Sequence, residues 1–339
     1  MLEPRQEKIL LAVIREYIET AEPVGSGVLV SKYNLNCSSA TIRNEMVRLE
    51  EMGYLYQPHT SAGRVPCDQG YRYYVDRLLE RRITPPHDAE ELAHRMGEAQ
   101  LELDALIDHT SRLLSQATHY TSLVLGPRLG RSLFKYLQLM NVGPHHLLLV
   151  MMTHTGGVVH RVVEISGSVD ADHLARITNL LNDRLRGLSV DAINNEFLRT
   201  LPVDSEILDR VAEATHDLSM QSRERVVYEG AANLLGQPEF RDVEKARALL
   251  EVLEQEKVVA EILDKSLAEE AVGVIIGGEN RISQMQGCTM VTAAYKVDGV
   301  LLGTIGVLGP TRLPYDRVIS IVQYVADSFS HRLGRATGS

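Results

Sequence analysis

Two adjacent side chains near the N-terminus, Arg43 and Asn44, can each form a pair of parallel hydrogen bonds with a planar partner. Arginine in this geometry matches the O6 and N7 atoms of guanine, and asparagine matches N6 and N7 of adenine. At about 100° per residue on a helix, they share one face with Ala40 and Val47, which can contact thymine methyl groups. These four residues predict a helix that reads base edges in the major groove of DNA.

Three residues with hydroxyl side chains lie at the expected start of this helix. Ser38, Ser39 and Thr41 stand at its expected N-terminus, where the backbone N–H groups and the helix dipole favour an anion. Phosphate oxygens accept hydrogen bonds from such hydroxyls. We expect these three residues to position the DNA backbone.

A second polar segment follows, with His59, Thr60 and Ser61 shortly before Arg64. Small polar residues can approach phosphates closely, and an arginine at a hairpin tip can enter a narrow minor groove. We therefore predict phosphate contacts from the first three residues and a wing contact from Arg64, although an ordinary polar turn would have a similar composition.

Three helices and a hairpin are expected to position these side chains. The inner face of the third helix would carry Ile42, Met46 and Leu49, and Ser38 or Ser39 would cap its start. The expected helices span 5–20, 27–33 and 39–52, the expected strands lie near 54–57 and 64–66, and a further helix is expected over 71–82. This order predicts a winged helix-turn-helix.

The rest of the chain alternates between strand and helix patterns. A proline-rich break at 84–86 predicts a linker, and approximate heptad spacing predicts one long helix over 88–118. Strands are expected over 133–141, 146–153, 157–165, 272–276, 290–297 and 300–308, with a mostly helical block over 170–265, a possible strand at 225–228 and a final helix over 315–331. Asp298-Gly299 predicts a hairpin turn.

We therefore predict an α+β fold with an insertion. Residues 1–82 would form the winged helix-turn-helix domain, and 83–167 a linker helix with the first part of an α+β domain. Residues 168–262 would form the insert, and 263–339 the second part of the α+β domain.

The charge distribution leaves DNA binding open. The net charge is −10, yet residues 1–82 hold 11 basic and 11 acidic side chains, so the remainder carries the whole excess. A neutral DNA-binding domain requires its positive charges to gather on one face. Three widely spaced cysteines and no signal-peptide pattern predict a cytoplasmic protein with free thiols.

Other chemistry has weaker support. Four histidines gather at His145, His146, His154 and His160, but no Cys/His spacing typical of a metal site accompanies them. The glycine pairs Gly156-Gly157 and Gly277-Gly278 fit the spacing of neither a phosphate-binding loop nor a dinucleotide-binding loop. No G-x-S-x-G sequence, typical of hydrolases with a serine nucleophile, is present. We expect no metal, no cofactor and no enzymatic activity.

Three N-terminal segments, 39–46, 59–66 and 70–76, closely resemble the bacterial heat-inducible transcription repressor family, HrcA. They read SATIRNEM, HTSAGRVP and GYRYYVD, and a distant segment, GTIGVLGPTR at 303–312 followed by Tyr315, resembles the family's C-terminal signature. The resemblance spans nearly the full length. Two mild departures are Cys67, where the family usually has a small hydroxyl residue, and Leu313, where it often has methionine. Cys67 puts a hydroxyl-to-phosphate contact in doubt at that position.

The resemblance implies a homodimer that binds an inverted-repeat operator ahead of chaperone operons. It further implies a GAF-like domain interrupted by a dimerising insert, and repression that depends on a GroEL-type chaperonin keeping the repressor folded. Heat-damaged proteins would compete for that chaperonin and so relieve repression.

Geometry independently favours a dimer, because one helix-turn-helix buries little surface for an operator of usual affinity. We expect the dimer contacts in the insert, 168–262. The alternative is a regulator whose GAF-like domain senses a small molecule, in a pocket among the strands of 132–166 and 271–309. An enzyme on the same scaffold is a third possibility.

Overall fold

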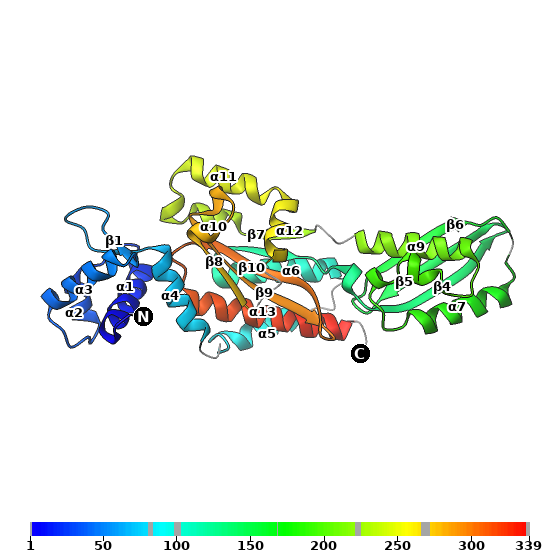
Figure 1. The fold of residues 1–339 in the computed structure, drawn as a ribbon, viewed down its shortest axis with the longest axis horizontal. Helices are drawn as coiled ribbons and strands as arrows, with labels where there is room; N and C mark the ends of the chain where they lie inside the picture. Colours follow the sequence, from blue (N-terminus) through cyan, green and yellow to red (C-terminus); the bar gives the residue numbers. More distant parts are fainter. Residues whose placement is uncertain are drawn as a thin grey trace.

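The computed structural model describes residues 2–80, 84–97, 103–167, 169–220, 225–265 and 272–336. The chain is elongated, with three units in a row (Figure 1). We call residues 2–80 the head, the segment 127–220 the insert, and the remaining described residues, which lie between them, the central unit.

The head contains the predicted helices and hairpin in the predicted order. Its elements are α1 (Pro4–Thr20), α2 (Ser26–Lys32), α3 (Ser39–Glu51), β1 (Leu55–Tyr56), β2 (Val65–Pro66) and α4 (Asp68–Leu79). Strands β1 and β2 pair antiparallel. Helix α4 begins three residues earlier than expected, and its expected end at Arg81-Arg82 lies outside the described residues.

The single long helix predicted over 88–118 is wrong. Helices α5 (Ala89–Gly97) and α6 (Leu103–Thr118) lie against each other, and the main-chain oxygen of Arg95 lies 2.9 Å from Nε2 of His109. Arg95 also bonds to Gln116. Residues 21 positions apart on one helix would be separated by about 30 Å, so α5 and α6 are two separate helices; residues 98–102 of the predicted helix lie outside the described residues.

A five-stranded antiparallel sheet forms the middle of the central unit. Its strands are β7 (Val226–Glu229), β3 (Thr121–Leu125), β10 (Val300–Pro310), β9 (Cys288–Val297) and β8 (Val272–Ile276), in that spatial order. Asp298 and Gly299 join β9 to β10 with positive φ angles of 51° and 78°, as the predicted hairpin turn requires.

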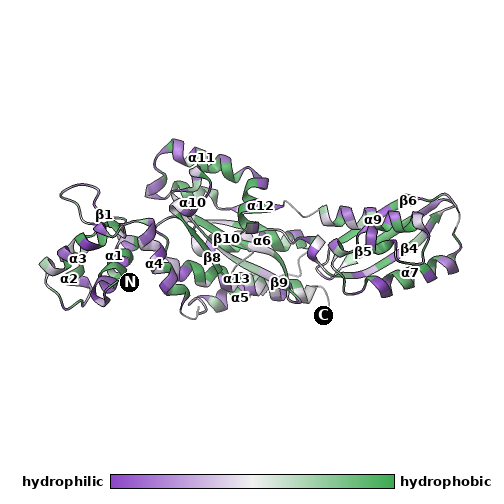
Figure 2. Ribbon diagram, in the orientation of Figure 1, coloured by the Kyte–Doolittle hydropathy of each residue, from purple (hydrophilic) through white to green (hydrophobic). Residues whose placement is uncertain are grey.

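Helices cover both faces of this sheet. Helix α13 (Tyr315–Ala336) and α6 pack on one face, while the helices α10 (Ala231–Leu235), α11 (Val243–Leu253) and α12 (Glu256–Lys265) lie on the other (Figure 1). Figure 2 shows that the strands between these layers are mostly hydrophobic. Short 3-10 turns cover 238–240, 277–279 and 283–285. No helix within the described ranges is both long and apolar enough to cross a membrane.

The insert has its own sheet and its own core. Strands β4 (Phe134–Gly143), β5 (His146–Thr153) and β6 (Val158–Glu164) form an antiparallel meander. One face packs on α7 (Ala171–Leu185) and α9 (Ser205–Met220), with α8 (Asn195–Leu198) alongside. Short 3-10 turns at 129–131 and 190–192 lie at its base.

These sheets correct the predicted domain boundaries. Residues 134–164, expected in the same α+β domain as 272–308, pair only among themselves in the described structure. Residues 226–262, expected in the insert, supply an edge strand, the helices α10 and α11 and most of α12 to the central unit. Strand pairing depends on long-range packing, which the alternation of residues along one strand does not encode.

Candidate DNA interface

Helix α3 is held firmly on the rest of the head. Ser38 caps it, since its Oγ accepts a 3.1 Å hydrogen bond from the backbone N–H of Thr41. The predicted inner face of Ile42, Met46 and Leu49 is buried. The buried carboxylate of Glu45 also accepts a 3.2 Å hydrogen bond from Nε2 of Gln6 on α1, so both apolar and polar contacts fix the helix.

The outer face of α3 carries the four predicted base readers. Ala40, Arg43, Asn44 and Val47 are all exposed. The side chains of Arg43 and Asn44 form no hydrogen bond or ion pair with any residue that the structure describes. A guanidinium and an amide on a rigid helix, both free to bond outward, are the groups that major-groove recognition requires.

Sequence reasoning missed one charged residue on this side of the helix. Arg48 follows Asn44 by one helical turn, and its side chain is 63% exposed with a 3.4 Å contact to Glu45. Helical phase alone could have identified it. Arg48 adds a second exposed cation to α3, one helical turn after Asn44.

The hydroxyls at the start of α3 already have partners inside the head. Ser38 and Thr41 are 2.9 Å apart between hydroxyl oxygens, and Ser39 Oγ lies 2.9 Å from Ser26 Oγ on α2. Ser38 and Ser39 nevertheless remain exposed. A hydroxyl can donate one bond and accept two, so these residues have spare capacity for a phosphate.

The loop between β1 and β2 projects from the head (Figure 1), with His59, Thr60 and Ser61 exposed on it. Gln57 closes the loop, because its Nε2 donates to the main-chain oxygens of Thr60 at 3.0 Å and Ala62 at 2.9 Å. Its role follows from the loop geometry and has no signal in the sequence. The three polar side chains are therefore presented on a braced loop.

Arg64 does not lie at the tip of the β1–β2 loop, the segment predicted to be a wing. Its side chain is only 13% exposed and its Nη2 lies 2.9 Å from Oε2 of Glu50. Its backbone forms a bridge with Val24, which lies two residues before the start of α2. The predicted minor-groove role disagrees with this placement, because the carboxylate of α3 holds the guanidinium at the base of the wing.

Gly63 allows the end of the β1–β2 loop to pass very close to the backbone of Val24. A Cβ atom there would lie 2.4 Å from the carbonyl carbon and oxygen of Val24. No side chain fits at such distances, so glycine is required for the close approach of two backbones. Cys67 follows at the end of β2, half-buried, and burial raises the pKa of its thiol.

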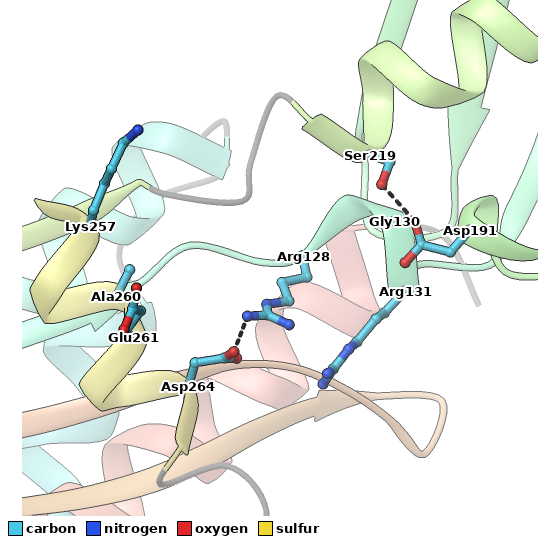
Figure 3. A pocket seen from close by; sticks show the side chains of 9 residues that line it. All are labelled: Arg128, Gly130, Arg131, Asp191, Ser219, Lys257, Ala260, Glu261 and Asp264. Carbon is cyan, nitrogen blue, oxygen red and sulfur yellow. Dashed lines mark hydrogen bonds and ion pairs between the residues drawn. The ribbon is translucent and has the colours of Figure 1, made fainter.

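Two cavities lie away from this interface. One, of about 300 Å³, lies where the insert meets the central unit (Figure 3). There Arg128 pairs with Asp264, and Ser219 donates a 2.5 Å hydrogen bond to Asp191. Within the described ranges no three His, Cys, Asp or Glu side chains are grouped as metal ligands.

The second cavity, of about 750 Å³, lies between the head and the central unit. Helix α4, helix α12, the edge strand β8 and the turn after β8 line it. Leu79, Ile262 and Ile282 give it apolar walls, and Arg72 and Glu279 supply charge. It is large enough for a small molecule.

Comparison with known proteins agrees with this arrangement. The family described as "HrcA protein C terminal domain" matches residues 104–319. The chain is 42% identical to the heat-inducible transcription repressor HrcA of Pelotomaculum thermopropionicum over 99% of both chains, and 42% identical to that of Desulforamulus reducens over 98% of both.

The chain belongs to the HrcA family of heat-inducible transcription repressors.

A solved structure also resembles this HrcA family member. A crystal structure of a hypothetical protein superposes with a TM-score of 0.65 and 27% sequence identity, covering 99% of this chain and all of the other. The overall α+β architecture of the HrcA family member is therefore shared with an experimentally determined protein.

Proposed function

We propose that this HrcA family member represses transcription as a homodimer that binds an inverted-repeat operator upstream of chaperone genes. The observation that carries the proposal is the outer face of α3, where Arg43 and Asn44 are exposed without partners. Ala40 and Val47 would contact thymine methyl groups beside them. Ser38, Ser39, Thr41, His59, Thr60 and Ser61 would position the phosphates.

The dimer contact is proposed for the open face of the β4–β6 sheet. The face opposite α7 and α9 is mostly apolar, and its side chains are exposed or half-buried. Its apolar members are Tyr136, Met140, Leu148, Val150, Met152, Val158 and Val162; its polar members are Gln138, His160 and, paired at one end of the face, His146 and Glu164. A contiguous apolar surface of this kind marks a protein interaction site.

The register of the strands makes this face continuous. Tyr136 lies opposite Met152, and Met152 opposite Val158, while Leu148 lies between Met140 and Val162. Such a surface can pack against a second copy of itself about a twofold axis. The proposed contact thus moves from the 168–262 segment to 134–164.

Operator titration tests the function. The purified protein would be titrated with a duplex carrying an inverted repeat from a chaperone promoter, and with the same bases after one half-site is scrambled, at fixed salt. We expect nanomolar affinity for the intact repeat, as for other specific dimers, and a large loss on scrambling. Equal, weak and salt-sensitive binding to both would contradict the proposal.

Modulation by a chaperonin belongs to the same proposal and is supported by the family membership. A GAF-like identity for the central unit is proposed on the same basis, with the five-stranded sheet between two helical layers as its support. Adding a GroEL-type chaperonin and ATP to the titration should raise the active fraction of the protein, and no change would contradict this part.

A small-molecule sensor is the second candidate, favoured by the cavity of about 750 Å³ between α4, α12 and β8. A ligand there would touch both the head and the central unit, and could change DNA affinity. Stabilisation by a metabolite in a thermal-shift screen, together with altered operator binding, would favour this function over the chaperonin-controlled one.

A further inference from the structure

Two sequence segments far apart in the chain meet where the head contacts the central unit. One is the segment 70–76 in α4, and the other is the segment 309–315 after β10. Tyr71 and Tyr74 of the first lie with ring centroids 5.8 Å and 6.3 Å from that of Tyr315 in the second. Base reading and the dimer contact use neither segment.

The hydrophobic core runs through this contact without interruption. Ile9, Leu10 and Leu49 of the head belong to the same buried cluster as Leu313 and Tyr315 of the central unit. Tyr71 is 2% exposed and Tyr315 is fully buried. A loosely tethered domain would not bury aromatic rings between itself and its neighbour, because interfaces of mobile domains are small and polar.

A first polar clamp lies on one side of the aromatic rings. Arg72 on α4 donates from Nε to Oε1 of Glu279 at 2.7 Å, and from Nη2 to the main-chain oxygen of Val274 at 2.6 Å. Asp68 accepts a 2.7 Å hydrogen bond from the backbone N–H of Gly278. Together with a second bond between the Arg72 guanidinium and Glu279, these bonds join α4 to β8 and the turn after it.

The turn after β8 is shaped for this contact. Gly277 has φ 49°, and a Cβ atom at this position would lie 2.2 Å from Oδ2 of Asp68. Both the positive φ and the close approach favour glycine.

A second set of polar contacts runs from the central unit to helix α1 of the head. Arg312 of the central unit donates from Nη1 to the main-chain oxygen of Ile18, near the end of α1, at 3.4 Å. Its other nitrogens bond to Glu239 and, at 3.1 Å, to Gln237. The guanidinium is only 13% exposed, so its bonds are shielded from water and geometrically restrained.

We propose that Arg72 and Arg312 are positioning residues that fix the angle of the head on the central unit. They would thereby set the half-site spacing that the dimer accepts. A helix-turn-helix dimer recognises half-sites at a separation dictated by how its two reading helices are held. This inference rests on the proposed function, because it assumes a dimer that reads an inverted repeat.

The test distinguishes recognition of a single half-site from the preference for a given spacing between two half-sites. Arg72→Ala, Glu279→Gln and Arg312→Ala variants, and the Arg72→Ala/Glu279→Gln double variant, would be titrated with inverted repeats whose spacer is varied over about five base pairs, half a helical turn. Each would also be titrated with a single half-site duplex. Arg247→Ala is the control, since Arg247 forms an exposed ion pair within α11, away from the contact.

We expect each variant at Arg72, Glu279 or Arg312 to bind the single half-site with the same affinity as the unaltered protein. At the preferred spacer, affinity should fall roughly tenfold, and the dependence on spacer length should flatten. The Arg72→Ala/Glu279→Gln double variant should lose less binding free energy than the sum of the two single variants, because either single change already breaks the contact between Arg72 and Glu279. Arg247→Ala should leave the spacer profile unchanged.

The inference would be overturned if affinity depended on spacer length in the same way in all of the Arg72, Glu279 and Arg312 variants as in the unaltered protein. Equal losses of affinity for the half-site and for the full repeat would also overturn it. Thermal unfolding and sedimentation of each variant would confirm that fold and dimer persist. Failure of the unaltered protein to prefer the intact repeat would instead contradict the proposed function.

Discussion

The outer face of α3 and the open face of the β4–β6 sheet are both exposed, but they present opposite chemistry. The first offers Arg43 and Asn44, which have hydrogen-bonding groups and no partner in the described chain. The second offers Met140, Val158 and Val162, whose side chains have almost no hydrogen-bonding capacity. A polar face fits base edges, whereas an apolar face fits another protein surface.

The two faces also lie at opposite ends of the molecule (Figure 1). The proposed functions of reading and pairing can therefore be disrupted separately. The contact between head and central unit lies between these two faces (Figure 1), so the proposed dimer contact could influence DNA binding only through rigid connections such as this one.

The largest expected effect comes from the apolar face. Val162→Asp places a charge on that face, where Val162 is 62% exposed in the single chain, so folding should be unaffected while pairing is lost. Sedimentation should show a monomer, and operator affinity should fall roughly 1,000-fold because the two heads no longer bind together.

Val243→Asp is the matched control for this change. Val243 is 74% exposed at the start of α11, away from the sheet face. This variant should remain a dimer with unchanged operator affinity. A dimeric Val162→Asp protein would show that the sheet face is not the pairing surface.

A smaller effect is expected from the reading face. Arg43→Ala should cost about 1–3 kcal/mol of binding free energy for each half-site and relax specificity at one base pair. Titration against operators substituted at each position would measure this. Equal loss on every sequence would instead identify Arg43 as a phosphate contact.

The wing should be sensitive to one added methyl group. Gly63→Ala would bring a Cβ atom within 2.4 Å of the Val24 backbone, so the wing must shift, at a cost of about 1–3 kcal/mol in the free energy of unfolding. Denaturant unfolding and operator titration would measure both consequences.

Gly27→Ala is the control for that substitution, since nothing lies within 4 Å of its Cβ position. Gly27 lies in α2, and alanine there should stabilise the head by about 0.5–1 kcal/mol. A Gly63→Ala protein as stable as Gly27→Ala would contradict the close approach.

The smallest effect concerns the cap of α3. Ser38→Ala removes the hydrogen bond to the Thr41 N–H and should lower the free energy of unfolding by about 1 kcal/mol. Ser38→Asp should retain the cap but bring a negative charge close to the DNA phosphates. It should therefore keep stability and lose operator affinity, unless Ser38 lies away from the phosphates.

Local patterns in the sequence were enough to predict the reading helix. Residues three and four apart on a helix share a face, so the burial of Ile42 and Met46 and the exposure of Arg43 and Asn44 follow from spacing alone. The turn at Asp298-Gly299 is equally local, because its backbone angles depend on two residues.

Contacts between distant residues decided the rest. Only the folded chain determines that β4–β6 form their own sheet, that Glu50 holds Arg64 at the base of the wing, and that Tyr315 packs against Tyr71. Periodicity specifies which side of an element is apolar but not which element covers it. The partner is chosen by packing and ion pairing across many residues, and these interactions exist only in the tertiary structure.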